Sequence, residues 1–487
     1  MRALLALTLA LARASAFDVS DALANHKVHR AVVTQREKKG GAFGRKQGEE
    51  RALLDAHGAA AGGGGGGGGL RDTVDPNWGK KCRAKLEAAG KWEGSDFEFA
   101  PPLPADDAAD LRVLWMTSDP HCFKQRGKRC VPLFERDFLY DWLLRDLPVR
   151  RRALLRAPGC KMLAPRAAYV FNGVLSCNPF DVAKIAEALK ICGTHGMLVH
   201  FGDENGSMDK MLGYGDWTLI LRQYYAKTAS STQWGDKLLH VPLGYSANFW
   251  QDMEEKEWTA ADPRDGGPVY PTEAMHTLES AGGAKGATQA AGSAPPPRTA
   301  SEALAAMPRP ADRKYTWAFF GDVKKSTRPF MAKGMAAVPR GFKFESHGFA
   351  GGDMHRPVEL RSIMQSSVFC PAPTGWYNPD SYRFSESLET GCFPLVDGHP
   401  TEWRDYIPAT ERYWEWYFKY LGVTDAVKPF VKLVDTWADI PAHIAAKMEH
   451  AQQLGAMQKQ MVEWWFDFKG ALAAKIGKMA KERVLDA

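Results

Sequence analysis

The stretch DSYRFSESLETGCFPLV, residues 380–396, carries the signals of a short helix followed directly by a buried strand. Asp380 or Ser381 can cap the start of the helix, and Gly391 can end it by taking a left-handed backbone conformation. Residues 393–396 are apolar and predict a core strand. A helix that leads into a core strand in this way is typical of an α/β fold.

The residues before this stretch complete a strand–loop–helix unit. Residues 360–370, LRSIMQSSVFC, predict a helix leading into a strand, and residues 371–379, PAPTGWYNP, predict a loop. The loop places the N-terminus of the next helix at the carboxyl edge of the strand, where open α/β sheets bind ligands. The free N–H groups and the dipole of a helix N-terminus favour a diphosphate.

Two charged residues, Arg383 and Glu386, lie one turn apart on this helix. Arg383 can add a charge-assisted contact to a phosphate, and Glu386 can accept hydrogen bonds from both ribose hydroxyls. The alternative interpretation is a surface helix with an i, i+3 ion pair. The flanking strands and caps favour a nucleotide-sugar site over that alternative.

The same segment resembles the exostosin family of inverting GT-B glycosyltransferases, whose C-terminal lobe carries a Ser-x-Arg-x-x-Glu-like element before Gly-Cys-x-Pro. In this chain the element consists of Ser381, Arg383, Glu386, Gly391, Cys392 and Pro394. Further stretches are similar to ribitol-xylosyltransferase-like members and occur in the family's order: LVHFGDENG near His200, LILRQYY near Arg222, HVPLGY near Pro242 and YTWAFFGDVKKSTRPFM around Arg328. The resemblance implies an α/β fold of the GT-B type, with two Rossmann-like lobes that face a cleft.

Composition and charge exclude several other classes of protein. The chain has 487 residues, and its net charge of +6 comes from 63 basic and 57 acidic residues. This charge is too small to indicate a nucleic-acid surface. The eight cysteines contain no C-x-x-C pair, so no zinc or redox motif is indicated. A secretory route would allow cysteines of the N-terminal half to pair, whereas Cys370 and Cys392 are expected to be small buried apolar residues.

The N-terminal sequence predicts entry into the secretory pathway. Residues 1–16 have a basic start, an apolar stretch and a small-x-small cleavage site, which are the features of a signal peptide. An amphipathic N-terminal helix or an organelle transit peptide is the alternative. We therefore expect a location in the lumen of the Golgi or endoplasmic reticulum, or secretion. A membrane contact is expected only through a leader that is retained.

Shifts in composition divide the rest of the chain. The expected parts are a disordered glycine-rich stem at 17–75, an N-terminal acceptor lobe at 76–259, a disordered insertion at 260–312, a C-terminal nucleotide-sugar-binding lobe at 313–441 and terminal helices at 442–487. By resemblance, the terminal helices are expected to cross back to the first lobe.

A second group of cations follows another predicted strand. Gly321 ends the strand at residues 316–320, and Lys324, Lys325 and Arg328 lie at the start of the helix that follows. A glycine turn with cations at a helix start suits a second phosphate contact, and a solvated basic loop is the alternative. The resemblance favours Arg328.

An inverting transfer needs a base that takes the proton of the acceptor hydroxyl. The loop HFGDENGS follows a predicted strand of the first lobe and offers Asp203 and Glu204, with His200 behind them. We favour Glu204, because its longer side chain can reach outward while Asp203 caps the turn. The alternative is a polar turn without a catalytic role.

The sequence contains no Asp-x-Asp triplet and no cluster with metal-ligand spacing, so neither a metal nor another cofactor is expected. Arg383, Arg328 and the helix dipole are then expected to stabilise the leaving group. The sequence predicts a hexosyl- or pentosyltransferase that moves a sugar from a nucleotide diphosphate sugar, expected to be UDP-linked, to a glycan or glycoconjugate with inversion. The alternative is a noncatalytic carbohydrate-binding protein on a decayed transferase scaffold.

Overall fold

The computed structural model describes these residues: 75, 77–91, 97–100, 111–116, 135–150, 159–172, 177–203, 206–224, 234–246, 249–250, 296–346, 357–375, 380–397, 432–434 and 436–487. All of them belong to one compact unit, Arg71–Ala487. The predicted signal peptide, Glu204 and residues 260–295 lie outside the described residues, as does all of the predicted stem except Asp75.

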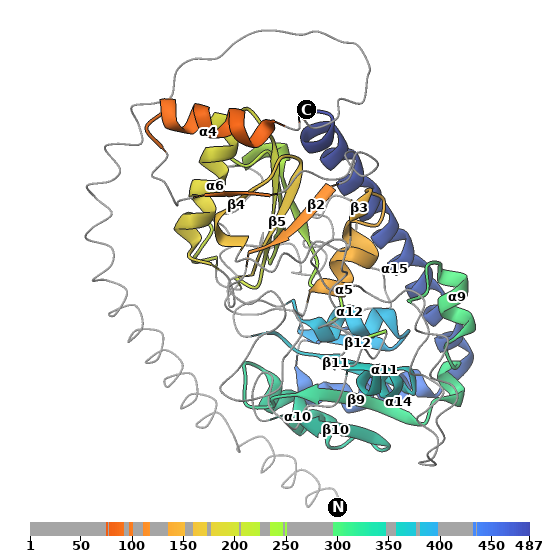
Figure 1. The fold of residues 1–487 in the computed structure, drawn as a ribbon. Helices are drawn as coiled ribbons and strands as arrows, with labels where there is room; N and C mark the ends of the chain where they lie inside the picture. The colour runs from red at the N-terminus through yellow and green to blue at the C-terminus, as the bar shows by residue number, and fades with distance from the viewer. Residues whose placement is uncertain are drawn as a thin grey trace, which may run out of the picture. The chain divides into compact units, whose positions relative to one another are not determined.

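The described residues from 77 to 250, here called the first lobe, contain a six-stranded parallel sheet (Figure 1). Its strands, in spatial order, are β3 (Val149–Arg150), β2 (Leu111–Trp115), β5 (Ala167–Asn172), β6 (Gly196–Phe201), β7 (Leu219–Gln223) and β8 (Leu238–Val241). Along the chain, β2 is the first strand of this sheet. The next strand, β3, pairs with one side of β2, and β5 to β8 follow on the other side. A topological switch point therefore lies between β2 and β5, and such points are where open α/β sheets bind ligands.

The described residues from 296 to 450, here called the second lobe, contain a five-stranded parallel sheet with the same progression. Its strands, in spatial order, are β10 (Gly341–Glu345), β9 (Tyr315–Gly321), β11 (Ser367–Ala372), β12 (Phe393–Asp397) and β13 (Lys432–Val434). The switch point of this sheet lies between β9 and β11. The predicted α/β class, with two Rossmann-like parallel sheets, is confirmed.

Helices connect the strands of both sheets. The longer ones are α4 (Trp78–Ala88), α6 (Pro179–Cys192), α10 (Arg328–Met335), α11 (Pro357–Gln365), α12 (Tyr382–Glu389), α14 (Ile440–Met448) and α15 (Ala451–Ala480). Local sequence explains the ends of α6: the Asn178 side chain accepts a hydrogen bond from Phe180 N, Pro179 occupies the first turn, and Gly193 ends the helix at a φ of 69°.

Short elements complete the fold. They are the paired strands β1 (Glu98–Phe99) and β4 (Met162–Leu163), the helical turns α5 (Arg136–Phe138), η2 (Leu139–Leu143), η3 (Gly159–Lys161), η5 (Gly235–Lys237), α9 (Ala300–Ala305), η9 (Pro310–Asp312) and η11 (Trp437–Asp439), and the C-terminal turn η12 (Lys481–Leu485).

The long helix α15 contacts residues of both lobes (Figure 1). Phe466 packs edge-to-face against Trp142 of η2, with 5.4 Å between the ring centroids. Trp465 donates its indole N–H to the Glu389 carboxylate of α12, at 2.8 Å. The aromatic residues of α15 therefore link α12 of the second lobe to η2 of the first lobe.

The structure corrects the expected end of the disordered insertion, which was placed at residue 312. Thr299 and Glu302 form a capping box at the start of α9, in which Glu302 N donates to Thr299 Oγ1 at 3.2 Å. Met307 then packs into the hydrophobic core of the second lobe. A local cap and an anchoring apolar side chain order residues 296–312 despite their alanine-rich composition.

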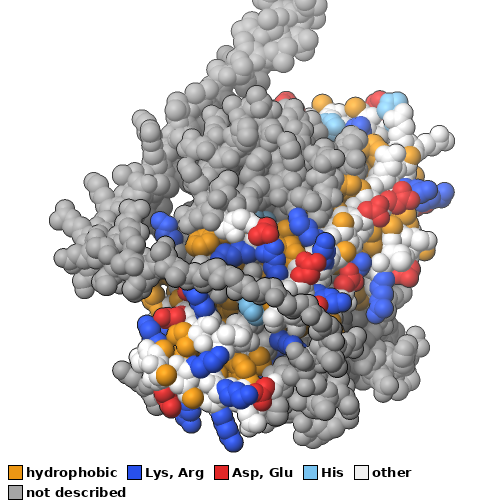
Figure 2. All heavy atoms as spheres, turned by 90° about the horizontal axis from the view of Figure 1, so that it is seen from above, with side chains coloured by type: hydrophobic (Ala, Val, Ile, Leu, Met, Phe, Trp, Pro, Cys, Tyr) orange, Lys and Arg blue, Asp and Glu red, His pale blue; other side chains and the backbone are white. Residues whose placement is uncertain are grey.

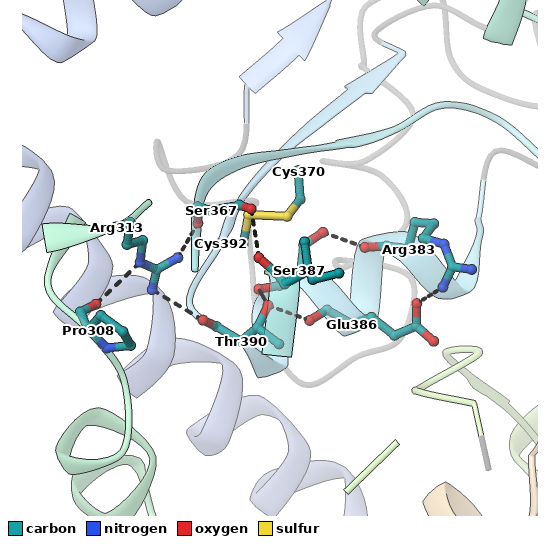
Figure 3. Close-up of a disulfide and its surroundings, with 10 residues drawn as sticks. Pro308, Arg313, Ser367, Cys370, Arg383, Glu386, Ser387, Thr390 and Cys392 are labelled. Atoms are coloured by element: carbon teal, nitrogen blue, oxygen red, sulfur yellow. Dashed lines mark hydrogen bonds and ion pairs between the residues drawn. A yellow bond between two sulfur atoms is a disulfide. The ribbon is translucent and has the colours of Figure 1, made fainter. Parts of the chain in front are cut away.

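Six of the described cysteines form disulfides: Cys82–Cys192, Cys160–Cys177 and Cys370–Cys392. The expectation that Cys370 and Cys392 are unpaired buried residues is wrong. Cys370 lies in β11 and Cys392 directly precedes the neighbouring strand β12, so strand pairing brings their Cα atoms to 5.7 Å (Figure 3). This separation is in the normal range for a disulfide.

Figure 2 shows Lys and Arg side chains interspersed with Asp and Glu over the described part of one face, in keeping with the small net charge. Among the described helices, none is both long enough and apolar enough to cross a bilayer.

Candidate active site at the junction of the two lobes

The N-terminus of α12 follows β11 at the switch point of the second sheet. Ser381 is the N-cap residue and has an extended backbone, with φ −144° and ψ 151°. Its hydroxyl makes no capping hydrogen bond and has no partner among the described residues, although Ser381 is only 7% exposed. The predicted cap position is thus correct, but the predicted capping bond is not made. Because Ser381 does not cap the helix, the first N–H groups of α12 can, as far as the described residues show, bind an external acceptor such as a phosphate oxygen.

Arg383 fixes this helix start to the end of β9. Its Nε donates to the carbonyl oxygen of Phe320 at 2.9 Å, and its Nη1 forms an ion pair with Glu386 Oε2 (Figure 3). The Arg383 side chain is 22% exposed, whereas that of Glu386 is fully buried. The i, i+3 ion pair considered as an alternative is therefore present, but it is largely buried and lies at a switch point.

Glu386 also reaches the first lobe. Its Oε1 accepts hydrogen bonds from the Ser246 hydroxyl at 2.7 Å and from Ser246 N at 3.3 Å. Ser246 lies in the loop after β8. Both carboxylate oxygens of Glu386 are thus engaged, one by Arg383 and one by Ser246.

Gly321 and Arg328 lie beside Arg383 at the end of β9. Gly321 is the last residue of β9 and has a φ of 146°, and a Cβ added there would lie 3.3 Å from Arg328 Nη1. Arg328 Nη1 donates to the Asp322 carbonyl oxygen at 3.1 Å. Arg383 binds the carbonyl oxygen of Phe320, the residue before Gly321. The two arginines predicted to bind phosphate therefore lie together at the end of β9.

Four hydrogen bonds between described residues join α12 and its N-terminus to the first lobe; besides the bond from Ser246 N to Glu386, three come from different residues. These three are Leu243 N to Asp380 Oδ2 at 3.4 Å, the Ser246 hydroxyl to Glu386 Oε1 at 2.7 Å, and the Tyr382 hydroxyl to Glu135 Oε1 at 2.6 Å. Leu243 and Ser246 follow the carboxyl end of β8. The open helix start therefore lies against the carboxyl edge of the first sheet.

Glu135 is a residue of this junction that sequence reasoning missed. It is 3% exposed, and its Oε2 accepts a hydrogen bond from Asn172 Nδ2 at 3.1 Å. Burial raises the pKa of Glu135, and the hydrogen bonds from Tyr382 and Asn172 oppose that rise. The only sequence signal is an acidic residue inside the apolar segment VPLFERDFLYDWLL, residues 131–144, which is too weak to single it out.

The structure places His200 and Asp203 inside the first lobe. His200 is fully buried, and its Nδ1 lies 2.6 Å from the Tyr214 hydroxyl. Burial, aided by the charge of Arg222, lowers the pKa of His200. Asp203 accepts hydrogen bonds from Ser207 N and Oγ, both at 3.2 Å, and so holds the turn as expected. Neither side chain is arranged to meet an acceptor, and Glu204 lies outside the described residues.

His200, Asp203 and Asp209 bring possible metal-ligand atoms within 4.8 Å of one another. Arg222 lies among them: its Nε donates to Asp209 Oδ1 at 2.9 Å, and its Nη2 lies 3.5 Å from Asp203 Oδ2. The guanidinium already supplies the positive charge that a metal would bring to these carboxylates. The cluster therefore fits a structural network of the lobe interior better than a metal site.

A cavity of about 210 Å³ lies elsewhere in the first lobe, between α4 and α6. The Lys91–Glu187 ion pair, with 3.0 Å between Nζ and Oε1, is part of its wall. The cavity includes none of the residues at the junction of the lobes.

No protein-family model matches the chain, and no curated protein matches its sequence. Among solved structures, the chain is similar to the crystal structure of Anabaena HepE in complex with UDP-glucose, at 9% sequence identity and with a TM-score of 0.29. The similarity covers 77% of this chain and 95% of the HepE chain. A TM-score this low does not carry the fold or the ligand of HepE over to this chain. The resemblance to exostosins likewise rests on short motifs alone.

Proposed function

We propose that this chain is a glycosyltransferase that moves a sugar from a nucleotide diphosphate sugar, expected to be UDP-linked, to a glycan or glycoconjugate with inversion. The observation that carries the proposal is the arrangement around α12. An open helix N-terminus and two arginines converge at the switch point of the second sheet, and the carboxyl edge of the first sheet lies against them. Two Rossmann-like lobes that meet in this way are the layout expected of a GT-B enzyme.

The charges at this point suit a departing diphosphate. Arg383 and Arg328 supply two guanidinium groups, and the N-terminus of α12 adds its N–H groups and dipole. Fixed positive groups of this kind stabilise the charge that develops as the bond from the sugar to the phosphate breaks. The proposed transfer therefore needs neither a metal ion nor another cofactor to stabilise the leaving group.

Glu386 has a defined role in this proposal. The ribose hydroxyls of the donor would replace the Ser246 hydroxyl as donors to its carboxylate, while the Arg383 ion pair fixes the carboxylate orientation. Donor binding would then exchange a hydrogen bond between the lobes for two hydrogen bonds to the nucleotide. Hydrogen bonds to a charged group contribute about 1.5–3 kcal/mol each, so gaining two for one favours donor binding.

The proposed location is the secretory pathway, in the Golgi or endoplasmic reticulum lumen or outside the cell. The three disulfides formed by described cysteines support it, because disulfides persist in oxidising compartments and are rare in the cytosol.

The test is UDP binding and UDP-sugar turnover by the purified chain and by Arg383→Ala. UDP at a hundredfold excess over its dissociation constant should stabilise the wild type by about 2.7 kcal/mol, read as a rise in Tm. Arg383→Ala should weaken UDP binding and lower kcat/KM on a panel of UDP-linked hexoses and pentoses. The expected loss is about 2–4 kcal/mol of transition-state stabilisation, because a preorganised charge donor is removed.

Arg309→Ala is the matched control, since the Arg309 side chain is 83% exposed and pairs only with its neighbour Asp312 among the described residues. Arg309→Ala should bind UDP and turn over UDP-sugars as the wild type does. Turnover should also persist in excess EDTA, because arginines rather than a metal hold the diphosphate. UDP binding without any turnover would support the alternative of a noncatalytic binding protein. Unchanged UDP affinity and turnover in folded Arg383→Ala would contradict the assignment of the donor site.

A further inference from the structure

Glu135 is a buried carboxyl whose contacts with described residues come from uncharged groups. The Tyr382 phenol binds one oxygen at 2.6 Å, and the Asn172 amide binds the other at 3.1 Å. Its neighbours Arg136 and Asp137 form an ion pair with each other, at 2.5 Å. Burying a carboxylate without a cation is unfavourable by several kcal/mol. A fold gains no stability from such a group, which makes it a candidate for a functional role.

Glu135 lies at the switch point of the first sheet. Asn172, which holds its Oε2, is the last residue of β5, and β5 borders this switch point. The segment that carries Glu135 belongs to the connection from β2, the other bordering strand, to β3. Ligands of open α/β sheets bind at the carboxyl ends of these strands.

Glu135 is also one side chain away from the proposed donor site. Tyr382, which binds Glu135 Oε1, is the first residue of α12, and the next residue is Arg383. The two switch points therefore meet through the Tyr382–Glu135 hydrogen bond. An acceptor hydroxyl that binds on the first-lobe side of the donor would lie next to Glu135.

We propose that Glu135 is the general base of the sugar transfer. This assignment rests on the function proposed above. In the step, the Glu135 carboxylate takes the proton of the acceptor hydroxyl while the acceptor oxygen forms a bond to the anomeric carbon. The bond from that carbon to the diphosphate oxygen breaks, and its electron pair leaves with the nucleoside diphosphate. The products are the inverted glycoside, the nucleoside diphosphate and protonated Glu135, which then releases its proton to solvent.

Tyr382 and Asn172 act as positioning residues, because each holds one carboxylate oxygen. The ionisable groups nearest Glu135 lie on α12 and after β7. Tyr382 donates to the Glu135 carboxylate, and Glu386 and Tyr224 lie near Tyr382. Burial raises the pKa of Glu135, which makes the carboxylate a stronger base than one in water.

The test compares Glu135→Gln with Asp137→Asn in the whole chain. Glu135→Gln keeps the size of the side chain and one of its two acceptor oxygens, and it removes the basicity. It should bind UDP within about twofold of the wild type and lower turnover of the UDP-sugar by about 100-fold to 10,000-fold, the usual span for a general base. Asp137→Asn removes a carboxylate two positions away and should keep turnover within about twofold.

Tyr382→Phe separates catalysis from mere contact between the lobes. It removes one hydrogen bond across the junction, the one from Tyr382 to Glu135, and keeps the carboxylate, so turnover should fall by no more than about tenfold. The acidic limb of its pH–rate profile should move to higher pH, because the pKa of Glu135 rises when a hydrogen bond to its charged form is lost. Equal losses of turnover and of UDP binding in Tyr382→Phe and Glu135→Gln would show a contact role and overturn the assignment.

Unfolding measurements from pH 4 to pH 8 give a readout that does not depend on activity. The folded pKa of Glu135 is raised, so its contribution to stability is fully present below the unfolded pKa of about 4.5 and is lost as pH rises through the folded pKa. The wild type should therefore lose stability relative to Glu135→Gln over this range. A constant difference, or normal turnover in folded Glu135→Gln, overturns the assignment. If the wild type neither binds UDP nor turns over any UDP-sugar, the proposed function itself fails, and the base assignment fails with it.

Discussion

At the scale of single residues, Gly391 shows how a sequence signal acquires a tertiary role. It follows α12 with a φ of 62°, as the sequence predicts for a residue that ends this helix. A Cβ at this position would lie 2.7 Å from Met307 Sδ and 3.0 Å from Gln458 Nε2. Glycine is therefore required twice, for its backbone conformation and for the close approach of two other segments.

Gly391→Ala should lower the free energy of unfolding by about 2–4 kcal/mol. Roughly 1 kcal/mol comes from the left-handed backbone, and the rest comes from crowding against Met307. Gly455→Ala is the matched control, because Gly455 lies inside α15 with open space where a Cβ would be. That change should stabilise the chain by about 0.5–1 kcal/mol, since alanine favours helix. Urea unfolding of both variants measures the difference, and equal effects would contradict this account of Gly391.

At the scale of elements, α12 and α15 are joined by a buried ion pair. Lys469 Nζ lies 2.5 Å from Glu389 Oε1, and both side chains are almost completely buried. The ammonium also lies 3.7 Å from the centroid of the Trp142 ring, which belongs to the first lobe. Burial lowers the pKa of Lys469 to about 8, and Glu389 opposes the shift, so the Lys469 ammonium stays largely charged at pH 7.

Lys469→Met should destabilise the chain by about 3–5 kcal/mol, because it leaves the Glu389 carboxylate buried without its cation. The double change Lys469→Met with Glu389→Leu should return stability to within about 2 kcal/mol of the wild type. The remaining difference includes the hydrogen bond that Trp465 donates to Glu389. Chemical unfolding of the two single variants and the double variant gives the coupling energy. Additive effects would mean that the two side chains do not act as a pair.

At the scale of the whole molecule, the alanine-rich insertion has two parts with different expected roles. The composition of residues 265–295 gives little apolar surface to bury, so a short Gly/Ser linker in their place should change Tm by no more than about 2 °C. Extending the replacement to residue 308 also removes the capping box at Thr299 and the core residue Met307. That deletion should lower Tm by several degrees, because it removes buried area. Scanning calorimetry of both replacement variants measures the change in Tm. Equal Tm values would contradict an anchoring role for α9.

The sequence by itself predicted the parts of the fold that depend on neighbours along the chain. Apolar runs and turn residues located β9, β11 and β12 of the second sheet, and Gly391 was identified as the end of α12. The aspartate of the HFGDENGS loop was expected to cap its turn, and Asp203 does so. These features follow from periodicity and local hydrogen bonding, which a stretch of about ten residues is long enough to show.

Only the tertiary structure decided which side chains meet. Glu135 and Tyr382 are 247 residues apart in sequence, and nothing near either one predicts their hydrogen bond. The Cys370–Cys392 disulfide depends on β11 and β12 being neighbours. The burial of His200 depends on the packing of Tyr214 and Arg222 around it. Such contacts form when distant segments pack together, and the alternation of apolar and polar residues along the chain does not specify them.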